Sequence, residues 1–221
     1  MTLRLYVFPP SPRALKVMTI ASHLRLPHEL RLVNLFGGDQ NQPEYVALNP
    51  NRRMPVMWHD GFVLWEANAI AQYLAAARPE AGLGGSNMRE QAEINRWQFW
   101  DLAHWEPALG TLIHEHMKKR ALTGEGPDPE AVRRGEDAFD TCARILEERL
   151  QQSAFVAADR ITVADFSLAA FLTFAEPAHM PIDPYSNLRR WHSAVTSLPA
   201  WSDARARGQT LTNREANVEG V

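Results

Sequence analysis

The sequence predicts two domains of different class, an α/β domain with the element order β-α-β-α-β-β-α and a following all-α domain. Short runs with period-2 alternation, separated by Gly, Pro, Asn and Asp, fill the first part of the chain, whereas long runs with helical spacing fill the rest. A stretch with three glycines lies between the two parts. We place the α/β domain at residues 1–78, a linker at 79–88, the all-α domain at 89–209 and a polar tail at 210–221.

The α/β domain begins with a strand, a loop and a helix. Alternation over residues 3–7 predicts the strand, and Pro9-Pro10 ends it. Ser11 then occupies the N-cap position of a helix and Pro12 its first turn. The elements expected next are a strand over 30–34, a short helix from Pro43, a hairpin of 56–59 and 62–64 around Asp60-Gly61, and a helix over 66–77.

The second domain shows helical spacing of apolar residues before and after a Gly- and Pro-rich loop at 123–129. Within it, Thr162 and Asp165 form a capping-box pattern directly before an apolar run. A carboxylate three residues after a threonine at this place is typical of a helix start. We therefore expect Asp165 to be structural and not catalytic.

Composition excludes several classes of function. The net charge is -3 and the basic residues are scattered among carboxylates, so a nucleic acid partner is not expected. Cys142 is the single cysteine, which rules out an intrachain disulfide and a Cys-x-x-Cys redox pair. No stretch approaches the roughly 20 apolar residues of a membrane span, and no signal peptide is recognisable. We expect a cytoplasmic protein without a membrane partner.

Three stretches, residues 6–17, 47–57 and 62–70, together resemble the glutathione transferases of the cytosolic, bacterial-like type with a serine in the active site. The box from Thr162 to Asp165 is similar to the capping box of that family's second domain. The resemblance covers nearly the whole chain. It implies a thioredoxin-like first domain that binds glutathione, an α-helical second domain that supplies most of an apolar electrophile pocket, and a homodimer.

Glutathione attacks electrophiles as a thiolate, although a free thiol with a pKa of about 8.5 is mostly protonated at neutral pH. A hydroxyl that donates a hydrogen bond to the sulfur at the positive end of a helix lowers this pKa. Ser11 is placed for that role, and the interval from Ser11 to Val17 matches the family's serine-type pattern. Tyr6 is the alternative, because other family classes use a tyrosine in the first strand. A plain N-cap is the structural alternative for Ser11.

The resemblance also implies which residues hold the tripeptide. Met54-Pro55 resembles the family's cis-proline turn, whose backbone groups bind the cysteinyl part. Glu66 can meet the γ-glutamyl amine, but Ala67 stands where the family usually has Ser or Thr and cannot supply a hydroxyl. Further residues expected near the glutathione are Arg53, Gln40 and Asn41.

For the electrophile pocket we expect Trp100, His104 and Trp105. A metal site is not expected, because His104 and His114 do not share a helical face and His114 and His116 point about 200° apart. The leading hypothesis is a glutathione transferase that conjugates glutathione, its co-substrate, to small hydrophobic electrophiles. Glutathione-dependent reduction, peroxidase activity, isomerisation or ether cleavage at the same site is one alternative. A non-catalytic ligand-binding or interaction protein is another, which the missing hydroxyl at Ala67 keeps open.

Overall fold

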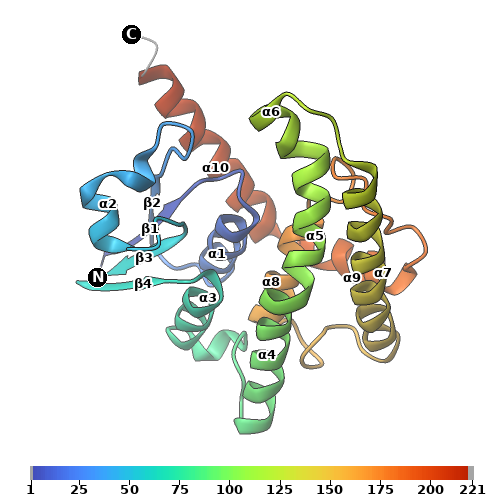
Figure 1. Ribbon diagram of the computed structural model, residues 1–221. Coiled ribbons are helices and arrows are strands. Elements are labelled where there is room, and N and C mark those ends of the chain that lie inside the picture. The colour runs from blue at the N-terminus through green and yellow to red at the C-terminus, as the bar shows by residue number, and fades with distance from the viewer. Residues whose placement is uncertain (1, 219–221) are drawn as a thin grey trace. The chain divides into compact units, whose positions relative to one another are not determined.

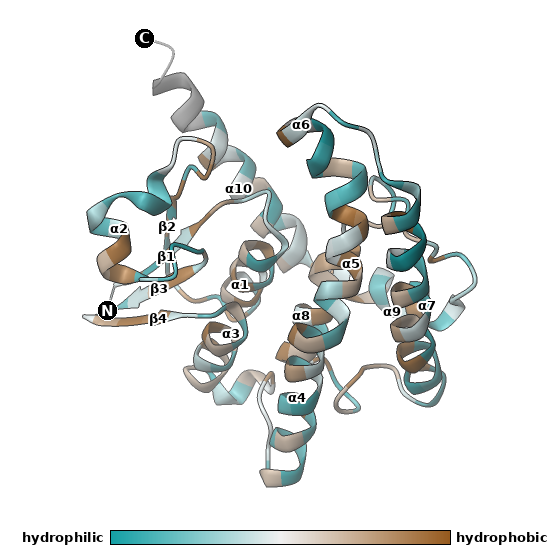
Figure 2. Cartoon of the chain, viewed as in Figure 1, coloured by the Kyte–Doolittle hydropathy of each residue, from teal (hydrophilic) through white to brown (hydrophobic). Residues whose placement is uncertain are grey.

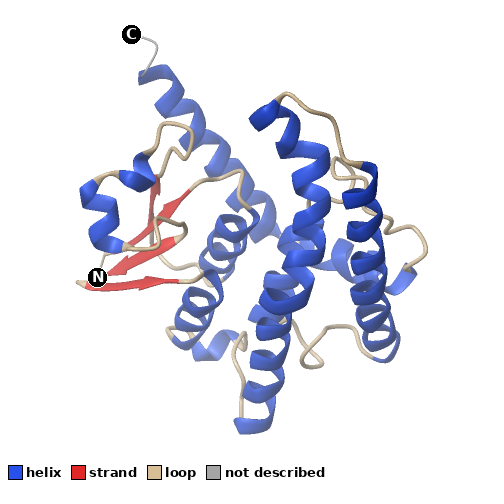
Figure 3. Ribbon diagram, viewed as in Figure 1, coloured by secondary structure: helices blue, strands red, loops and turns tan. Residues whose placement is uncertain are grey.

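The computed structural model describes residues 2–218. They form two compact units, shown with their strands and helices in Figures 1 and 3. The N-terminal unit holds the chain up to Ala81 together with the described residues from Ser197 onward, and the helical unit is Gly82–Thr196. Residues 197–209 thus lie in the N-terminal unit, whereas the sequence pattern grouped them with the helices. Within residues 2–218, no helix is long and apolar enough to cross a membrane.

The N-terminal unit is built on a four-stranded sheet. Its strands lie in the order β2-β1-β3-β4, with β2 parallel to β1 and the other neighbours antiparallel. This arrangement confirms the predicted element order and gives the thioredoxin-like fold that the resemblance implied. The strands are β1 (Leu3–Val7), β2 (Glu29–Leu32), β3 (Val56–His59) and β4 (Phe62–Trp65).

Helices cover both faces of the sheet (Figure 1). Helices α1 (Pro12–His23) and α3 (Ala67–Ala76) pack together on one face, while α2 (Pro43–Leu48) lies on the other. On the α2 side, Tyr45 joins a buried cluster with Val33 and Val56. Short 3-10 turns occur at Asp39–Asn41 and Pro79–Ala81.

The last helix, α10 (Pro199–Val218), packs against α1 and β2. The Ser22 hydroxyl donates to the Asp203 carboxylate at 2.7 Å, and the Arg207 guanidinium donates to the His28 carbonyl at 3.1 Å. Residues 210–218, which we expected as the start of a polar tail, belong to this helix. Residues 219–221 of that expected tail lie outside the described residues.

The helical unit is arranged around α8 (Val163–Leu172), in which every residue is buried. Figure 2 shows α8 in the brown of apolar residues and α7 largely in teal, because α7 buries only one side. Two π-helical segments, Asp101–Trp105 and His114–Lys118, flank α5. The helices of this unit are α4 (Met88–Trp100), α5 (Glu106–Ile113), α6 (Lys119–Thr123), α7 (Pro129–Gln152), α8 (Val163–Leu172) and α9 (Ser186–Thr196).

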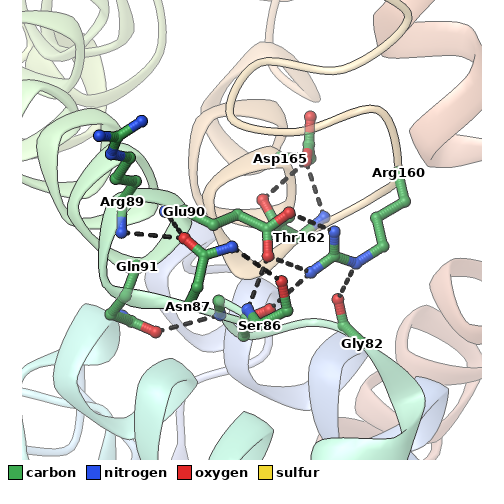
Figure 4. A network of polar contacts seen from close by, with 11 residues as sticks. Gly82, Ser86, Asn87, Arg89, Glu90, Gln91, Arg160, Thr162 and Asp165 are labelled. Atoms are coloured by element: carbon green, nitrogen blue, oxygen red, sulfur yellow. Dashed lines mark hydrogen bonds and ion pairs between the residues drawn. The ribbon is translucent and has the colours of Figure 1, made fainter.

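Figure 4 shows a polar network at the start of the helical unit. The Arg160 guanidinium forms a two-point ion pair with Glu90, at 2.5 and 2.8 Å, and donates to the Gly82 and Gly84 carbonyls at 2.8 and 2.9 Å. It therefore fixes the segment before α4 to the segment before α8. Such bidentate arginine–carboxylate pairs combine charge with fixed geometry.

The predicted capping box at the start of α8 is confirmed. The buried Asp165 carboxylate accepts hydrogen bonds from the Thr162 backbone N–H at 2.8 Å, the Thr162 hydroxyl at 3.0 Å, the Val156 N–H at 3.0 Å and the Trp191 indole at 2.9 Å. Burial raises the pKa of Asp165, and the donated hydrogen bonds act in the opposite direction. Asp165 thus serves the core of the helical unit.

Candidate active site

The strand register brings four loops to one edge of the sheet. Tyr6 lies opposite Val56, Val56 opposite Trp65, and Val7 opposite Leu32. Strands β1, β2 and β4 therefore end at the same edge at which β3 begins. The segments that follow or precede them at this edge are the β1–α1 loop with Ser11, residues 36–42, the Met54-Pro55 dipeptide and the Glu66-Ala67 dipeptide.

Ser11 is the N-cap residue of α1, with extended backbone angles (φ -82°, ψ 132°). Its backbone N–H donates to the Phe8 carbonyl at 2.8 Å, and its carbonyl accepts from the Leu15 N–H at 2.9 Å. The Ser11 side chain makes no capping hydrogen bond and is partly exposed. The hydroxyl is thus held at the positive end of a helix without being used to close that end.

Tyr6, the alternative to Ser11, packs on the α2 side of the sheet. Its ring makes an edge contact with Tyr45, with ring centroids 6.3 Å apart, and borders the cluster of Val33, Tyr45 and Val56. Burial raises the pKa of the Tyr45 phenol. These contacts favour a packing role for Tyr6.

The loop before β3 is held by two side chains that share one acceptor. The Tyr45 hydroxyl and the buried Asn49 amide both donate to the Arg53 carbonyl, at 2.8 and 2.7 Å. The following Met54-Pro55 bond is cis, as the resemblance implied. The Arg53 side chain is exposed. The backbone around Met54 is therefore fixed from the α2 side while the Arg53 guanidinium stays accessible.

Glu66 has an unusual backbone conformation. It precedes α3 with φ 72° and ψ 114°, an angle pair that non-glycine residues rarely adopt, and its side chain is exposed and forms no cap. Ala67 is buried at the first position of α3. Strain of this kind concentrates at ligand-binding sites.

The loop after β2 presents Gln40 and Asn41 differently. Asn41 is exposed, whereas Gln40 is half-buried and donates to the Leu35 carbonyl at 3.3 Å. The Gln40 side-chain oxygen is buried and has no hydrogen-bond partner among the described residues. Of the two, Asn41 is the better placed to reach a ligand from solvent.

A buried polar pair that joins the two helices starting at this edge was not predicted from the sequence. Lys16 in α1 is completely buried, and its ammonium donates to the Asn68 side-chain oxygen of α3 at 2.9 Å. Asn68 is buried as well. The available signal was weak: α1 is apolar on nearly every side from Ala14 to Ala21, so a lysine at position 16 had no exposed face to occupy.

The residues expected in the electrophile pocket lie at the end of α4, for Trp100, and on the π-helical segment that follows it, for His104 and Trp105. Trp100 is half-buried, with its ring centroid 6.2 Å from that of the exposed His104. Trp105 is fully buried, and its indole donates to the Leu168 carbonyl at 3.0 Å. Trp105 is therefore a core residue that cannot touch a ligand directly, because helical spacing alone does not separate buried aromatic rings from exposed ones.

Comparison with known proteins identifies the family of this chain. Residues 1–76 match the glutathione S-transferase N-terminal domain, and residues 129–194 match the glutathione S-transferase C-terminal domain. The chain is 32% identical over 205 residues to glutathione S-transferase D7 of Drosophila melanogaster, over 90% of this chain and 87% of the relative. The chain belongs to the glutathione S-transferase family. The enzymes of this family use glutathione as co-substrate.

Solved transferase structures share the fold of this transferase. A delta-class glutathione transferase of Nilaparvata lugens is 28% identical with a TM-score of 0.81, covering 93% of this chain and 94% of that one. Glutathione transferase F7 of Populus trichocarpa is 24% identical with a TM-score of 0.83, covering 93% and 98%. Among the described residues, no group of three or more His, Cys, Asp or Glu side chains could hold a metal ion.

Proposed function

We propose that this transferase conjugates the glutathione thiolate to small hydrophobic electrophiles, with Ser11 donating a hydrogen bond to the sulfur. The observation that carries the proposal is that Ser11 lies at the loop-bearing edge of the sheet with a hydroxyl that takes no part in capping α1. Hydrogen bonding to the charged form and the positive end of the helix both lower a thiol pKa.

The other segments at the same edge of the sheet bind the rest of the tripeptide. The backbone at Met54 and Pro55 binds the cysteinyl part, and the exposed Glu66 carboxylate meets the γ-glutamyl amine. Ala67 offers no hydroxyl, so the γ-glutamyl carboxylate is held by backbone N–H groups at the start of α3. In this proposal Gln40 and Asn41, in the loop after β2, face the glycyl carboxylate, and Arg53 lies beside the bound tripeptide.

A glutathione titration of the wild type, Ser11→Ala and Tyr6→Phe tests this proposal, with thiolate absorbance followed across pH. We expect the wild type to hold the bound thiol well below its free pKa of about 8.5. Ser11→Ala should return the pKa toward that value and lower kcat/KM by about 10²-fold, the usual scale for one lost donor to a reacting anion. Tyr6→Phe should change neither. Wild-type binding without a lowered thiol pKa would overturn the role of Ser11.

A panel of electrophiles and peroxides separates conjugation from glutathione-dependent reduction. Cys142 is buried in α7 of the helical unit, and burial raises its pKa, which disfavours a mixed disulfide with the enzyme's own thiol. If the enzyme turns over peroxides faster than every electrophile in the panel, its main activity is reduction and not conjugation. No binding of glutathione by the wild type would favour the non-catalytic alternative.

We also propose that the enzyme acts as a homodimer. Strand β4 is an edge strand and carries two exposed aromatic side chains, Phe62 and Trp65. Exposed apolar groups on an open edge are typical of a surface that another chain covers. Light scattering should give twice the mass of the 25.0 kDa chain, and a monomer at micromolar concentration would overturn this.

A further inference from the structure

A fully buried lysine joins the two helices that start at the active-site edge. Lys16 has no solvent-exposed surface, and its ammonium donates to the Asn68 side-chain oxygen at 2.9 Å. A charged group in a protein interior costs free energy that an apolar side chain of similar volume would not. The energetic cost of this placement calls for a role beyond filling space.

The position of the pair suggests that role. Lys16 lies five residues after Ser11, which is about 7.5 Å along the axis of α1. Asn68 is the second residue of α3 and directly follows Glu66 and Ala67. The Lys16–Asn68 hydrogen bond therefore links the second turn of α1 to the first turn of α3, the two helices whose starts present the sulfur-contacting group and the γ-glutamyl-contacting groups.

We propose that Lys16 is a positioning residue for glutathione, which acts through Asn68 by fixing the start of α1 relative to the start of α3. This inference rests on the proposed function. Ser11 and Glu66-Ala67 contact different parts of one tripeptide, so both contacts form only when the two helix starts are in register. A displacement of about 1 Å between groups that must act together can cost up to about 10²-fold in rate.

The charge of Lys16 adds a second contribution. It bonds the residue next to Ala67, where the α3 dipole already favours an anion. In a buried environment, charges act over longer distances than they do in water. Lys16 thereby supports the γ-glutamyl carboxylate at the position where the side-chain hydroxyl is missing.

The test compares Lys16→Met, Lys16→Arg and a matched control, Lys119→Met. Lys119 is a partly buried lysine of the helical unit that pairs with Glu115 at 3.2 Å and takes no part in the proposed site. Glutathione Kd, the pKa of the bound thiol and the KM for the electrophile are measured well below the unfolding temperature of each variant.

We expect Lys16→Met to raise the glutathione Kd about tenfold and to raise the bound thiol pKa, with the electrophile KM unchanged. Lys16→Arg should restore most of the affinity because it keeps the charge and a donor, and Lys119→Met should bind as the wild type does. Folded Lys16→Met with wild-type Kd and thiol pKa would show that the lysine is only structural. An equal loss of glutathione affinity in Lys119→Met would lead to the same conclusion.

If Lys16→Met does not fold, Asn68→Ser decides the question, because it keeps the lysine and shortens its acceptor. A raised Kd in folded Asn68→Ser supports the inference, and an unchanged Kd in that variant overturns it. Failure of the wild type itself to bind glutathione overturns the proposed function, and the inference with it. Wild-type binding with unaltered variants overturns the inference alone.

Discussion

Two helix starts of the helical unit, those of α4 and α8, differ from the starts of α1 and α3 in the N-terminal unit. In the helical unit, Asn87 caps α4 by accepting from the N–H groups of Arg89 and Glu90, at 3.0 and 3.1 Å, and Asp165 closes the start of α8. In the N-terminal unit, Ser11 and Glu66 precede α1 and α3, and neither side chain forms a cap.

This difference separates stability from binding. A capped helix start satisfies backbone donors within the protein and contributes to its own stability. An uncapped start, combined at Glu66 with a strained backbone, leaves polar groups for an outside partner. The comparison predicts that substitutions of the residues that close the starts of α4 and α8 lower the free energy of unfolding, whereas substitutions at the two uncapped starts change ligand binding.

The largest effect should come from Asp165→Ala. The substitution leaves the Trp191 indole and the N–H groups of Val156 and Thr162 buried without their acceptor. Unsatisfied buried donors each cost about 1 to 3 kcal/mol, so we expect a loss of about 4 kcal/mol in the free energy of unfolding, measured in urea.

Asp137→Ala is the control for this change. Asp137 is an exposed carboxylate that pairs with Arg133 on the surface of α7, and its removal should cost less than about 0.5 kcal/mol. If the two substitutions cost the same, the closed start of α8 does not hold the helical unit together.

The second-largest effect should come from acid, which lowers the free energy of unfolding of the helical unit. Burial lowers the pKa of His192 in α9 to about 4, and a hydrogen bond to the Ala169 backbone opposes this. Because the unfolded chain binds the proton with a pKa near 6.5, the stability that neutral His192 contributes is present above pH 6.5 and is lost as the pH falls toward 4. The loss should reach about 3 kcal/mol.

His192→Phe isolates this contribution, since carboxylates also titrate in the lower part of the same pH range. Urea denaturation at each pH gives the free energy of unfolding of both proteins. The value for the wild type minus the value for the variant should fall from pH 7 to pH 4, because only the wild type takes up this proton. A difference that is constant with pH would show that His192 takes up its proton at the same pH in both states.

The sequence predicted what depends on neighbours along the chain. The strand at 3–7, the hairpin around Asp60-Gly61 and the box of Thr162 and Asp165 are local patterns, and each forms as expected. Contacts between distant residues left no such pattern. Arg160 and Glu90 are 70 positions apart, and Lys16 and Asn68 are 52 apart. Periodicity also could not distinguish the core side chain of Trp105 from one that faces a ligand.

Arg160→Met should have a smaller effect than either change above. The variant loses the two-point pair with Glu90 and the bonds to the Gly82 and Gly84 carbonyls, but the site is partly exposed and water can replace some of these contacts. We expect a loss of about 2 kcal/mol.

The companion variant Arg160→Lys keeps the charge and loses the planar fork, so it should recover less than half of that loss. Hydrogen exchange of the amides from 82 to 90 is the second measurement. If exchange there stays as slow as in the wild type, another contact holds this segment.

The smallest effects test the comparison itself. Asn87→Ala removes a cap that accepts two N–H groups and should cost about 1 kcal/mol. Ser11→Ala removes a side chain of the same capping class that makes no such bond, so its cost should stay below about 0.5 kcal/mol.

Both variants are measured by urea denaturation, first without glutathione and then with a saturating amount. Glutathione should stabilise Asn87→Ala as much as the wild type and Ser11→Ala less, because the stabilisation grows with the logarithm of ligand concentration over Kd and is smaller for the weaker binder. An equal cost of both substitutions without ligand would mean that Ser11 serves α1, and the distinction between the two kinds of helix start would fail at the residue on which the proposed chemistry depends.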